Sequence, residues 1–332
     1  MDKVANLSPQ KRRELFSESG ALRGMNPAVI EKDFWVCWVL KQLFADTELK
    51  ARLIFKGGTT LSKVFGLIER FSEDIDLVLD WRLLGLGEGH EDPYQERSRT
   101  QRDRFNAQIN KRAAQYIAGP LIEDLNRLFA RCPEISASID PDQAQTIHIV
   151  YPMAFSEQYL RPEVCLEIGP LASWEPSASH EIQPYAAESF AEVFQDPTCL
   201  VIALDAERTF WEKATILHQE AHRATATPSR YSRHYYDLYK MAESGVRGRA
   251  LRDLQLLEDV VEFKQRFYPC AWARYEDARP GSFKLIPSKI RRAELKKDYR
   301  AMEIMIFGEV PAFEVILSKL QGLQDAINAL EG

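Results

Sequence analysis

Two aspartates separated by one residue, close to a glycine-rich segment, form the part of the sequence best suited to chemistry. Asp74 and Asp76 lie in the run RFSEDIDL at residues 70–77, which follows KGGTT at residues 56–60. Side chains two positions apart in a strand point to the same face of a sheet. The two carboxylates would therefore share a face and could hold Mg²⁺ or Mn²⁺ through their oxygens.

The glycine-rich segment adds the means to approach a phosphate. Gly57 and Gly58 allow close passage of the backbone, and a helix that starts after them favours negative charge. Phosphoryl and nucleotidyl transfer require this combination of metal carboxylates and a phosphate cradle. The segment lacks the spacing of a P-loop. Because a lone pair of aspartates is also typical of a solvated strand edge, the hypothesis rests on both features together.

Two neighbouring carboxylates repel each other, so a metal site would need a further ligand. Glu167 is the best third carboxylate, since it interrupts the apolar run VCLEI at residues 164–168. An exposed strand position is the alternative interpretation of Glu167. Glu163 and Asp205 are weaker candidates for the same role.

Two further pairs lie in the second half of the chain. Thr209 and Lys213 are four residues apart on one helix face, where the lysine could reach phosphate oxygens. The alternative is a surface lysine that pairs with Thr209 or Glu212. Arg233 and Asp237 have the same spacing, and their alternative is a helix salt bridge of about 0.3–0.5 kcal/mol.

His218 and His222 also have the spacing of a metal-binding pair on a helix. No HExxH pattern surrounds them. A solvated helix face is therefore the favoured interpretation of both histidines.

The periodicity of apolar residues indicates the elements that would position these groups. Strands are predicted at 52–55 and 75–79, on either side of the glycine turn, and at 145–151 and 163–169. Residues 172–187 indicate a loop or a crossing between lobes. Helices are predicted at 28–45, 95–131, 205–223, 233–244, 247–267 and 310–331. The pattern favours an α+β protein with a first lobe at 1–200 and a mainly helical lobe at 201–332.

Bulk composition narrows the class of protein. The chain has 332 residues, 45% hydrophobic residues and a net charge of −6, as in ordinary globular proteins. No apolar run is long enough to span a bilayer and no signal peptide is visible, so a cytoplasmic location without membrane contact is expected. The five cysteines include no CxxC pair, which favours reduced, mostly buried thiols over a disulfide framework or structural zinc.

Four motifs together resemble a known family. They are FKGGTT at 55–60, RFSEDIDL at 70–77, TFWEK at 209–213 and RHYYDL at 233–238, in this order. The sequence resembles the AbiEii/AbiGii (MenT-type) toxins of type IV toxin–antitoxin systems, within the DNA polymerase β-like nucleotidyltransferase superfamily. The segments EKDF at 31–34 and DYRAM at 298–302 are also similar, so the resemblance covers almost the whole chain.

The resemblance implies a nucleotidyltransferase core with a mixed sheet, followed by a mainly helical C-terminal lobe. It places the metal at Asp74, Asp76 and Glu167, the last being the weakest match. Thr59 or Thr60 would replace the serine that often follows the first glycine in the superfamily. The implied catalytic residues are Asp74, Asp76, Lys213 and Asp237, and the implied nucleotide-binding residues are Lys56, Gly57, Gly58, Thr59, Thr60, Ser72, Lys213 and Arg233.

The implied reaction is transfer of a nucleoside monophosphate from an NTP to an acceptor hydroxyl, with Mg²⁺ or Mn²⁺ and release of pyrophosphate. The family suggests tRNA as an acceptor and a separate antitoxin protein as a partner. Basic segments at 97–112 and 289–300 are candidates for tracking an RNA backbone, and solvated helix faces are the alternative interpretation. Two alternatives stay open: a kinase-like phosphotransferase, and a non-catalytic nucleotide-binding module that recognises a protein partner.

Overall fold

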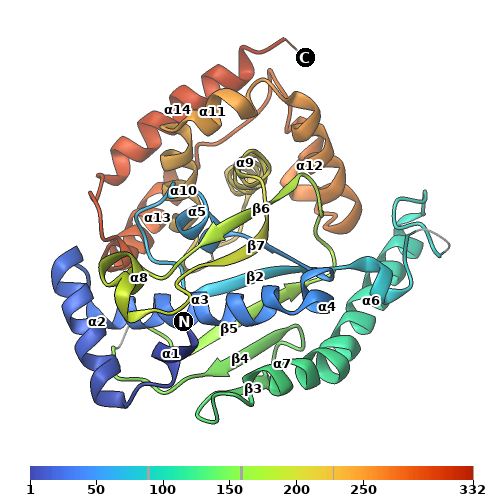
Figure 1. The fold of residues 1–332 in the computed structure, drawn as a ribbon. Coiled ribbons are helices and arrows are strands. Elements are labelled where there is room, and N and C mark those ends of the chain that lie inside the picture. The colour runs from blue at the N-terminus through green and yellow to red at the C-terminus, as the bar shows by residue number, and fades with distance from the viewer. Residues whose placement is uncertain (88–89, 158–159, 227, 332) are drawn as a thin grey trace. The chain divides into compact units, whose positions relative to one another are not determined.

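The computed structural model describes residues 1–87, 90–157, 160–226 and 228–331, which form two compact units. The first unit comprises Met1–Val64 and Phe71–Leu204, and the second comprises Phe65–Arg70 and Asp205–Gly332. All seven strands belong to the first unit, whereas the long helices that follow residue 205 belong to the second (Figure 1).

The first unit is organised by a mixed seven-stranded sheet in the order β3-β4-β5-β2-β1-β7-β6. The middle strand β2 is antiparallel to β1 and parallel to β5. This architecture confirms the expected α+β class with a mixed sheet. The strands are β1 (Leu53–Lys56), β2 (Asp74–Leu79), β3 (Ser136–Ile139), β4 (Thr146–Val150), β5 (Glu163–Gly169), β6 (Ser177–Ile182) and β7 (Cys199–Leu204).

One prediction about the sheet was wrong. Residues 172–187 read as a loop, yet β6 lies within them and pairs antiparallel with β7. The strand sequence SASHEI carries small and polar side chains, and most of them are at least partly exposed. A strand at the edge of a sheet needs few apolar side chains, which is why the pattern gave no signal.

A central helix, α3 (Pro27–Ala45), lies along one face of the sheet (Figure 1). Asn26 caps its first turn by accepting a hydrogen bond from the Ala28 amide at 2.9 Å. Nearly all its side chains are buried, because it also packs against α2 (Pro9–Arg23) and α8 (Tyr185–Ser189). Trp35 stacks on Tyr151 with the ring centres 5.4 Å apart. A helix that is apolar all round is a core element rather than a surface helix.

Three consecutive charged residues interrupt this apolar helix, and two of them hold loops of the first unit. The carboxylate of Glu31 accepts hydrogen bonds from the amides of Ala154 and Phe155, at 2.7 and 3.0 Å. The ammonium of Lys32 donates to the carbonyl of Glu163 at 2.5 Å. Both charged groups are buried and bonded, so the segment similar to the family at 31–34 positions the start of β5.

The third charged residue, Asp33, forms a buried ion pair with Lys63, which ends α5 (Gly58–Lys63). The two groups are 2.8 Å apart, and both side chains are almost fully buried. Asp33 also accepts a hydrogen bond from the Tyr185 amide at 2.7 Å, and the Lys63 ammonium lies 3.7 Å from the centre of the Tyr185 ring. This group of contacts ties the helix that follows the glycine turn to the core helix α3.

The rest of the first unit is helical and flanks the sheet. The helix predicted at 95–131 is present as α6 (Arg99–Tyr116) and α7 (Ile122–Phe129), joined by a π-helical turn at Ile117–Leu121 that contains Pro120. Proline cannot donate the backbone hydrogen bond of a regular helix, which explains the altered turn. The short helices α1 (Asp2–Ala5) and α4 (Thr47–Lys50) complete this unit.

The second unit is built from helices. They are α9 (Ala206–His222), α10 (Ser232–Ala242), α11 (Gly245–Ala250), α12 (Leu254–Phe267), α13 (Lys289–Met302) and α14 (Phe313–Asn328). The single helix predicted at 247–267 is two helices, because Asp253 caps a new start by accepting from the Leu256 amide at 3.0 Å. Helix α13 was missed, since its many basic residues obscure the buried positions Leu295, Tyr299 and Met302.

Asp298, the first residue of the family-like segment at 298–302, has a structural role. Its carboxylate accepts hydrogen bonds from the Arg230 amide at 2.6 Å and from the Ser232 amide and hydroxyl at 2.8 and 2.6 Å. These donors lie at the start of α10, where a negative charge is stabilised by the helix dipole. Asp298 therefore fixes the beginning of the helix that carries Asp237.

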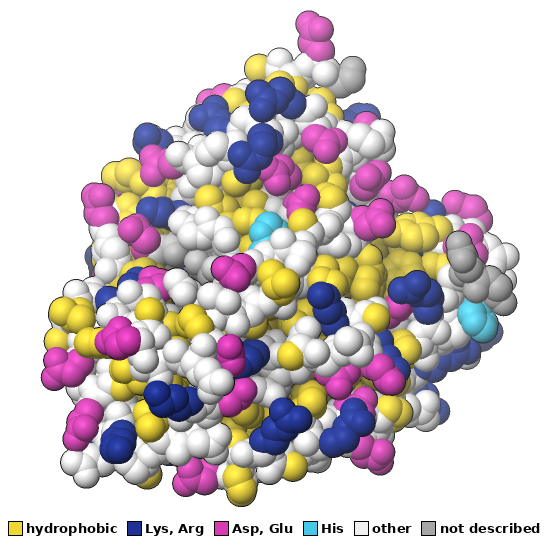
Figure 2. Space-filling model, in the orientation of Figure 1, with side chains coloured by type: hydrophobic (Ala, Val, Ile, Leu, Met, Phe, Trp, Pro, Cys, Tyr) yellow, Lys and Arg dark blue, Asp and Glu magenta, His cyan; other side chains and the backbone are white. Residues whose placement is uncertain are grey.

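The surface carries both signs of charge. Figure 2 shows acidic and basic side chains intermixed over the visible face, in keeping with a net charge of −6. Within the described part of the chain, no helix has both the length and the apolar character needed to cross a membrane.

Candidate active site

The central strand places the two aspartates on one face of the sheet. Asp76 lies opposite Lys56 of β1 and opposite Glu167 of β5 in the strand register. Side chains at registered positions of neighbouring strands point to the same face and lie close together. Lys56, Asp76 and Glu167 therefore form a row across three strands, and Asp74 lies one step along β2 on the same face.

The glycine turn is shaped around one of these carboxylates. Gly57 has a φ of +84°, and a Cβ atom added to it would lie 2.0 Å from the Asp76 Oδ2 atom. A side chain at this position would both strain the backbone and displace the carboxylate. Gly57 is thus required by the placement of Asp76 as well as by the turn.

The two threonines of the turn fasten the start of α5, Thr59 to β2 and Thr60 to the turn itself. The Thr59 hydroxyl donates to the Asp74 carbonyl at 2.5 Å, and the Thr60 hydroxyl donates to the Gly57 carbonyl at 2.7 Å. A hydroxyl has one hydrogen to donate, so both hydrogens serve the local fold in this structure. Contact of Thr59 or Thr60 with phosphate stays a prediction. Ser72 is half-buried just before β2, and its carbonyl lies 3.4 Å from the Thr59 hydroxyl.

The donor set of this row suits a hard divalent cation. Asp76 is half-buried and Glu167 is exposed, whereas Asp74 is half-buried with its Oδ1 atom fully enclosed. Carboxylate oxygens are the ligands that such a cation prefers. A Cβ atom at Gly57 would overlap the Asp76 carboxylate, so the absence of a side chain there supports a fixed ligand. Of the weaker candidates, Glu163 has its Oε1 atom 2.5 Å from His148 Nδ1, and Asp205 precedes α9 in the second unit.

The other predicted residues meet in a buried ion cluster within the second unit. Asp237 is fully buried, and Arg70 donates to both of its carboxylate oxygens, at 2.6 and 2.8 Å. The Lys213 ammonium lies 2.7 Å from the Asp237 Oδ2 atom. The predicted residues Lys213 and Asp237 are therefore brought together, and Arg70 joins them.

The cluster shows which of the alternative interpretations of Lys213 and Asp237 is correct. A surface lysine paired with Thr209 or Glu212 is wrong, because Lys213 is buried against Asp237 and the Thr209 hydroxyl donates to a backbone carbonyl. Among the described residues, the ion pairs of Asp237 are with Arg70 and Lys213, and none joins it to Arg233. Arg70 was missed as a site residue, although it begins the motif at 70–77.

The charges of the cluster do not cancel. Burial opposes ionisation of Asp237, but Arg70 and Lys213 outweigh it and hold the pKa of Asp237 well below its usual range. Burial lowers the pKa of Lys213, and Asp237 opposes that effect. Two positive groups and one negative group leave one net positive charge. A buried net charge of this sign favours the binding of an anion.

His218 has a structural role. The ring is fully buried, its Nδ1 atom accepts from the Lys284 amide at 3.1 Å, and its Nε2 atom lies 3.0 Å from the Arg274 carbonyl. The expected solvated face is therefore wrong for His218. Burial in the second unit lowers the pKa of His218 to about 4, so the ring is neutral at neutral pH.

Comparisons with known proteins identify the family and the fold. A family described as the nucleotidyl transferase AbiEii toxin of type IV toxin–antitoxin systems matches residues 38–319. Among solved structures, the chain is similar to MenT4, a nucleotidyltransferase toxin from Mycobacterium tuberculosis, with a TM-score of 0.52 and 15% identity over 96% of this chain and 90% of that one. This likeness shows a shared fold. Among curated proteins, no relative matches the sequence.

The contact between Gly57 and Asp76 leads to the first prediction. Gly57→Ala should lower Mn²⁺ affinity by about 10–100-fold, the range found when the support of a metal ligand is lost. Titration of Mn²⁺ followed by electron paramagnetic resonance measures the change.

The matched control is Gly24→Ala. Gly24 has a φ of +63°, but a Cβ atom there would meet no atom within 4 Å. The control carries similar backbone strain without displacing a carboxylate. Equal Mn²⁺ affinity in wild type and Gly57→Ala would show that the turn does not support a metal ligand.

The second prediction concerns acid stability. The unfolded-state pKa of histidine is about 6.5, and that of His218 in the fold is about 4. The unfolded chain therefore binds the extra proton first, so His218 lowers the free energy of unfolding as pH falls from 6.5 towards 4.

In His218→Gln, the free energy of unfolding should decrease less as the pH falls. Urea unfolding at a series of pH values between 7 and 4 measures this decrease. His90→Gln, at an exposed histidine, is the control and should keep the wild-type slope. Identical slopes in the wild type and His218→Gln would contradict the assignment.

Proposed function

This chain belongs to the AbiEii family of nucleotidyltransferase toxins, and we propose that it transfers a nucleoside monophosphate from an NTP to an acceptor hydroxyl, with release of pyrophosphate. One observation carries the proposal: the strand register sets Asp76 between Lys56 and Glu167, with Asp74 on the same face. A single sheet face thus offers three carboxylates and an ammonium beside a glycine turn.

In this proposal Asp74, Asp76 and Glu167 hold a divalent cation, Mg²⁺ or Mn²⁺. The bound cation would polarise the α-phosphate and neutralise the leaving pyrophosphate. Gly57 keeps the Asp76 carboxylate in place, and Lys56 contributes positive charge at the same face. The backbone of Gly57 and Gly58 passes beside these groups without side chains, which leaves room for a phosphate.

We assign the cluster of Arg70, Lys213 and Asp237 to the phosphates of the nucleotide. Its support is the net positive charge that remains after Asp237 has been paired. Asp237 has no need to contact the nucleotide in this role, because its charge holds Lys213 and Arg70 in fixed positions. Arg233 lies one helical turn before Asp237 and would add to the positive charge.

An RNA is the proposed acceptor, with tRNA as the specific candidate, and a separate antitoxin protein is the proposed partner. A groove of about 610 Å³ between α13 and α14 supports an RNA acceptor. Lys289, Arg292 and Lys296 line it from α13, with Glu314 on the opposite helix. Cationic side chains spaced along one helix suit a phosphate backbone, even though the whole chain is acidic.

The leaving group tests the reaction directly. The chain, incubated with Mg²⁺, cellular RNA and an NTP labelled at the α-phosphate, should move the label into RNA and release pyrophosphate. Asp74→Asn and Asp76→Asn should each reduce the rate by about 1,000-fold or more, since metal stabilisation contributes several kcal/mol. Glu181→Gln, at an exposed position of the edge strand β6, is the control and should leave the rate unchanged.

Each alternative has its own outcome in this assay. Appearance of the α-label in a nucleoside diphosphate, together with transfer of label in a parallel reaction with γ-labelled NTP, would identify a kinase-like phosphotransferase. NTP binding without transfer to RNA or protein would identify a binding module. Label in protein instead of RNA would overturn the proposed acceptor and keep the reaction.

The role of the ion cluster is tested by Lys213→Gln, which removes the ammonium and leaves Asp237 paired with Arg70. NTP affinity should fall by about tenfold or more, since a charged contact contributes about 1.5–3 kcal/mol. Mn²⁺ affinity without nucleotide should not change. The control is Lys240→Gln, because Lys240 of α10 pairs with Glu69 in the same unit and has no assigned role. A loss of thermal stability with unchanged NTP affinity would show that Lys213 is structural.

A further inference from the structure

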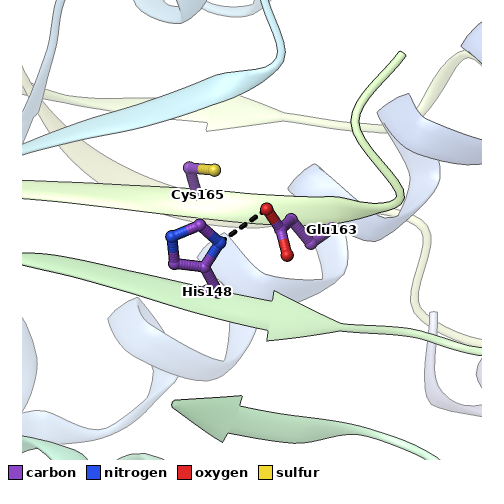
Figure 3. Close-up of side chains that lie close together, drawn as sticks. All are labelled: His148, Glu163 and Cys165. Atoms are coloured by element: carbon purple, nitrogen blue, oxygen red, sulfur yellow. Dashed lines mark ion pairs between the residues drawn. The ribbon is translucent and has the colours of Figure 1, made fainter. Parts of the chain in front are cut away.

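A second group of metal-binding side chains lies on β4 and β5. His148 of β4 is opposite Cys165 of β5 in the strand register, and Glu163 lies two positions before Cys165 on the same face. Figure 3 shows the three side chains together. One ligand atom from each lies within 4.8 Å of the others. No part of the proposed transfer reaction uses these three residues.

We propose that His148, Glu163 and Cys165 bind a divalent transition metal of the Zn²⁺ class. The site has ligands of its own, but it would adjoin the carboxylates that hold the cation of the transfer reaction, because Cys165 lies opposite Asp74 in the strand register. The proposal does not depend on the proposed function, because it rests on the donor atoms and their geometry.

The donor set selects the class of metal. An imidazole nitrogen, a carboxylate oxygen and a thiolate sulfur together match the ligands of Zn²⁺. A hard cation such as Mg²⁺ prefers oxygen ligands only. Three protein ligands would leave one tetrahedral position for water.

A fourth side chain orients the histidine. The Nε2 atom of His148 lies 2.7 Å from the Asp140 Oδ2 atom. Asp140 is itself fixed, since its Oδ1 atom accepts from the amides of Asp142 and Gln143 at 2.7 and 2.9 Å. An Nε2–H bond to Asp140 leaves Nδ1 directed at Glu163. A metal-bound histidine usually donates its other N–H to a carboxylate in this way.

The distance between His148 and Glu163 is close to the distance between two ligands of one bound ion. His148 Nδ1 and Glu163 Oε1 are 2.5 Å apart, which is the distance of a short ion pair. Two ligands of a tetrahedral zinc are about 3.3 Å apart, given bonds of about 2.0–2.1 Å. Placing an ion between the two atoms requires their separation to widen by less than about 1 Å, which a side-chain rotation can supply.

The ion would enter from the side of His148 and Glu163, whose side chains are 19% and 23% exposed, whereas Cys165 is buried. The Arg161 guanidinium lies 3.4 Å from the Cys165 sulfur. Arg161 is exposed and could turn into solvent when an ion arrives. The bound ion would join β4 to β5 at Cys165, which is the register partner of Asp74 on β2.

Cobalt is a suitable probe, because a Co²⁺–thiolate bond absorbs light by charge transfer. The full-length chain is freed of metal with a chelator and titrated with Co²⁺ in excess Mg²⁺. We expect one equivalent of Co²⁺ to give this absorption, and one equivalent of Zn²⁺ to displace it. Zn²⁺ should also raise the melting temperature of the wild-type protein.

Variants separate this site from other cysteines and from the nucleotide site. Cys165→Ser should remove the absorption, whereas Cys270→Ser, at a half-buried cysteine elsewhere, should keep it. Asp140→Asn, which leaves the three ligands intact, should weaken Co²⁺ binding by about 10–100-fold. Asp76→Asn should bind Co²⁺ as the wild type does. Circular dichroism checks that each variant is folded.

Three outcomes would overturn the proposal. They are a wild-type protein with no Co²⁺–thiolate absorption, an absorption that survives Cys165→Ser, and an absorption that Asp76→Asn abolishes. The last would assign the ion to the carboxylates of the transfer reaction. Because transfer is measured separately with Mg²⁺ alone, failure of one proposal leaves the other intact.

Discussion

The close contact between the Gly57 backbone and the Asp76 carboxylate is the constraint on which the first unit depends. An atom at the Cβ position of Gly57 would lie 2.0 Å from Asp76 Oδ2, so the turn and the carboxylate must be built together. The turn joins β1 to α5, and the Thr59 hydroxyl fastens α5 to the backbone of β2. With β2 fixed in this way, parallel pairing with β5 brings Glu167 beside Asp76.

Buried charges hold the surrounding elements in both units. In the first unit, Asp33 and Lys63 tie α3 to α5, and in the second, Asp237 holds Arg70 and Lys213. Buried ion pairs contribute little net stability, because desolvation offsets their attraction. Loss of one partner is costly, however, so such pairs fix the arrangement of the elements that carry them. The family-like segments at 31–34 and 233–238 are explained by this structural role.

The sequence predicted local features well where the spacing of residues is compatible with only one type of secondary structure. Alternation around Asp74 and Asp76 predicted a shared face, and the β4 and β5 strands were found within one residue of their ends. Long-range pairing lies beyond such patterns. Nothing local indicates that Arg70 meets Asp237, 167 residues later, or that His148 lies opposite Cys165. The edge strand β6 and the basic helix α13 were missed because packing, rather than propensity, decides their structure.

One measurement tests the central claim most directly. Crystals of the protein soaked with Mn²⁺ and a non-hydrolysable NTP analogue would locate the ion by its anomalous scattering. The account predicts a peak within ligand distance, about 2.0–2.3 Å, of carboxylate oxygens of Asp74, Asp76 and Glu167. A peak held by other residues, with these three carboxylates uncoordinated, would contradict it.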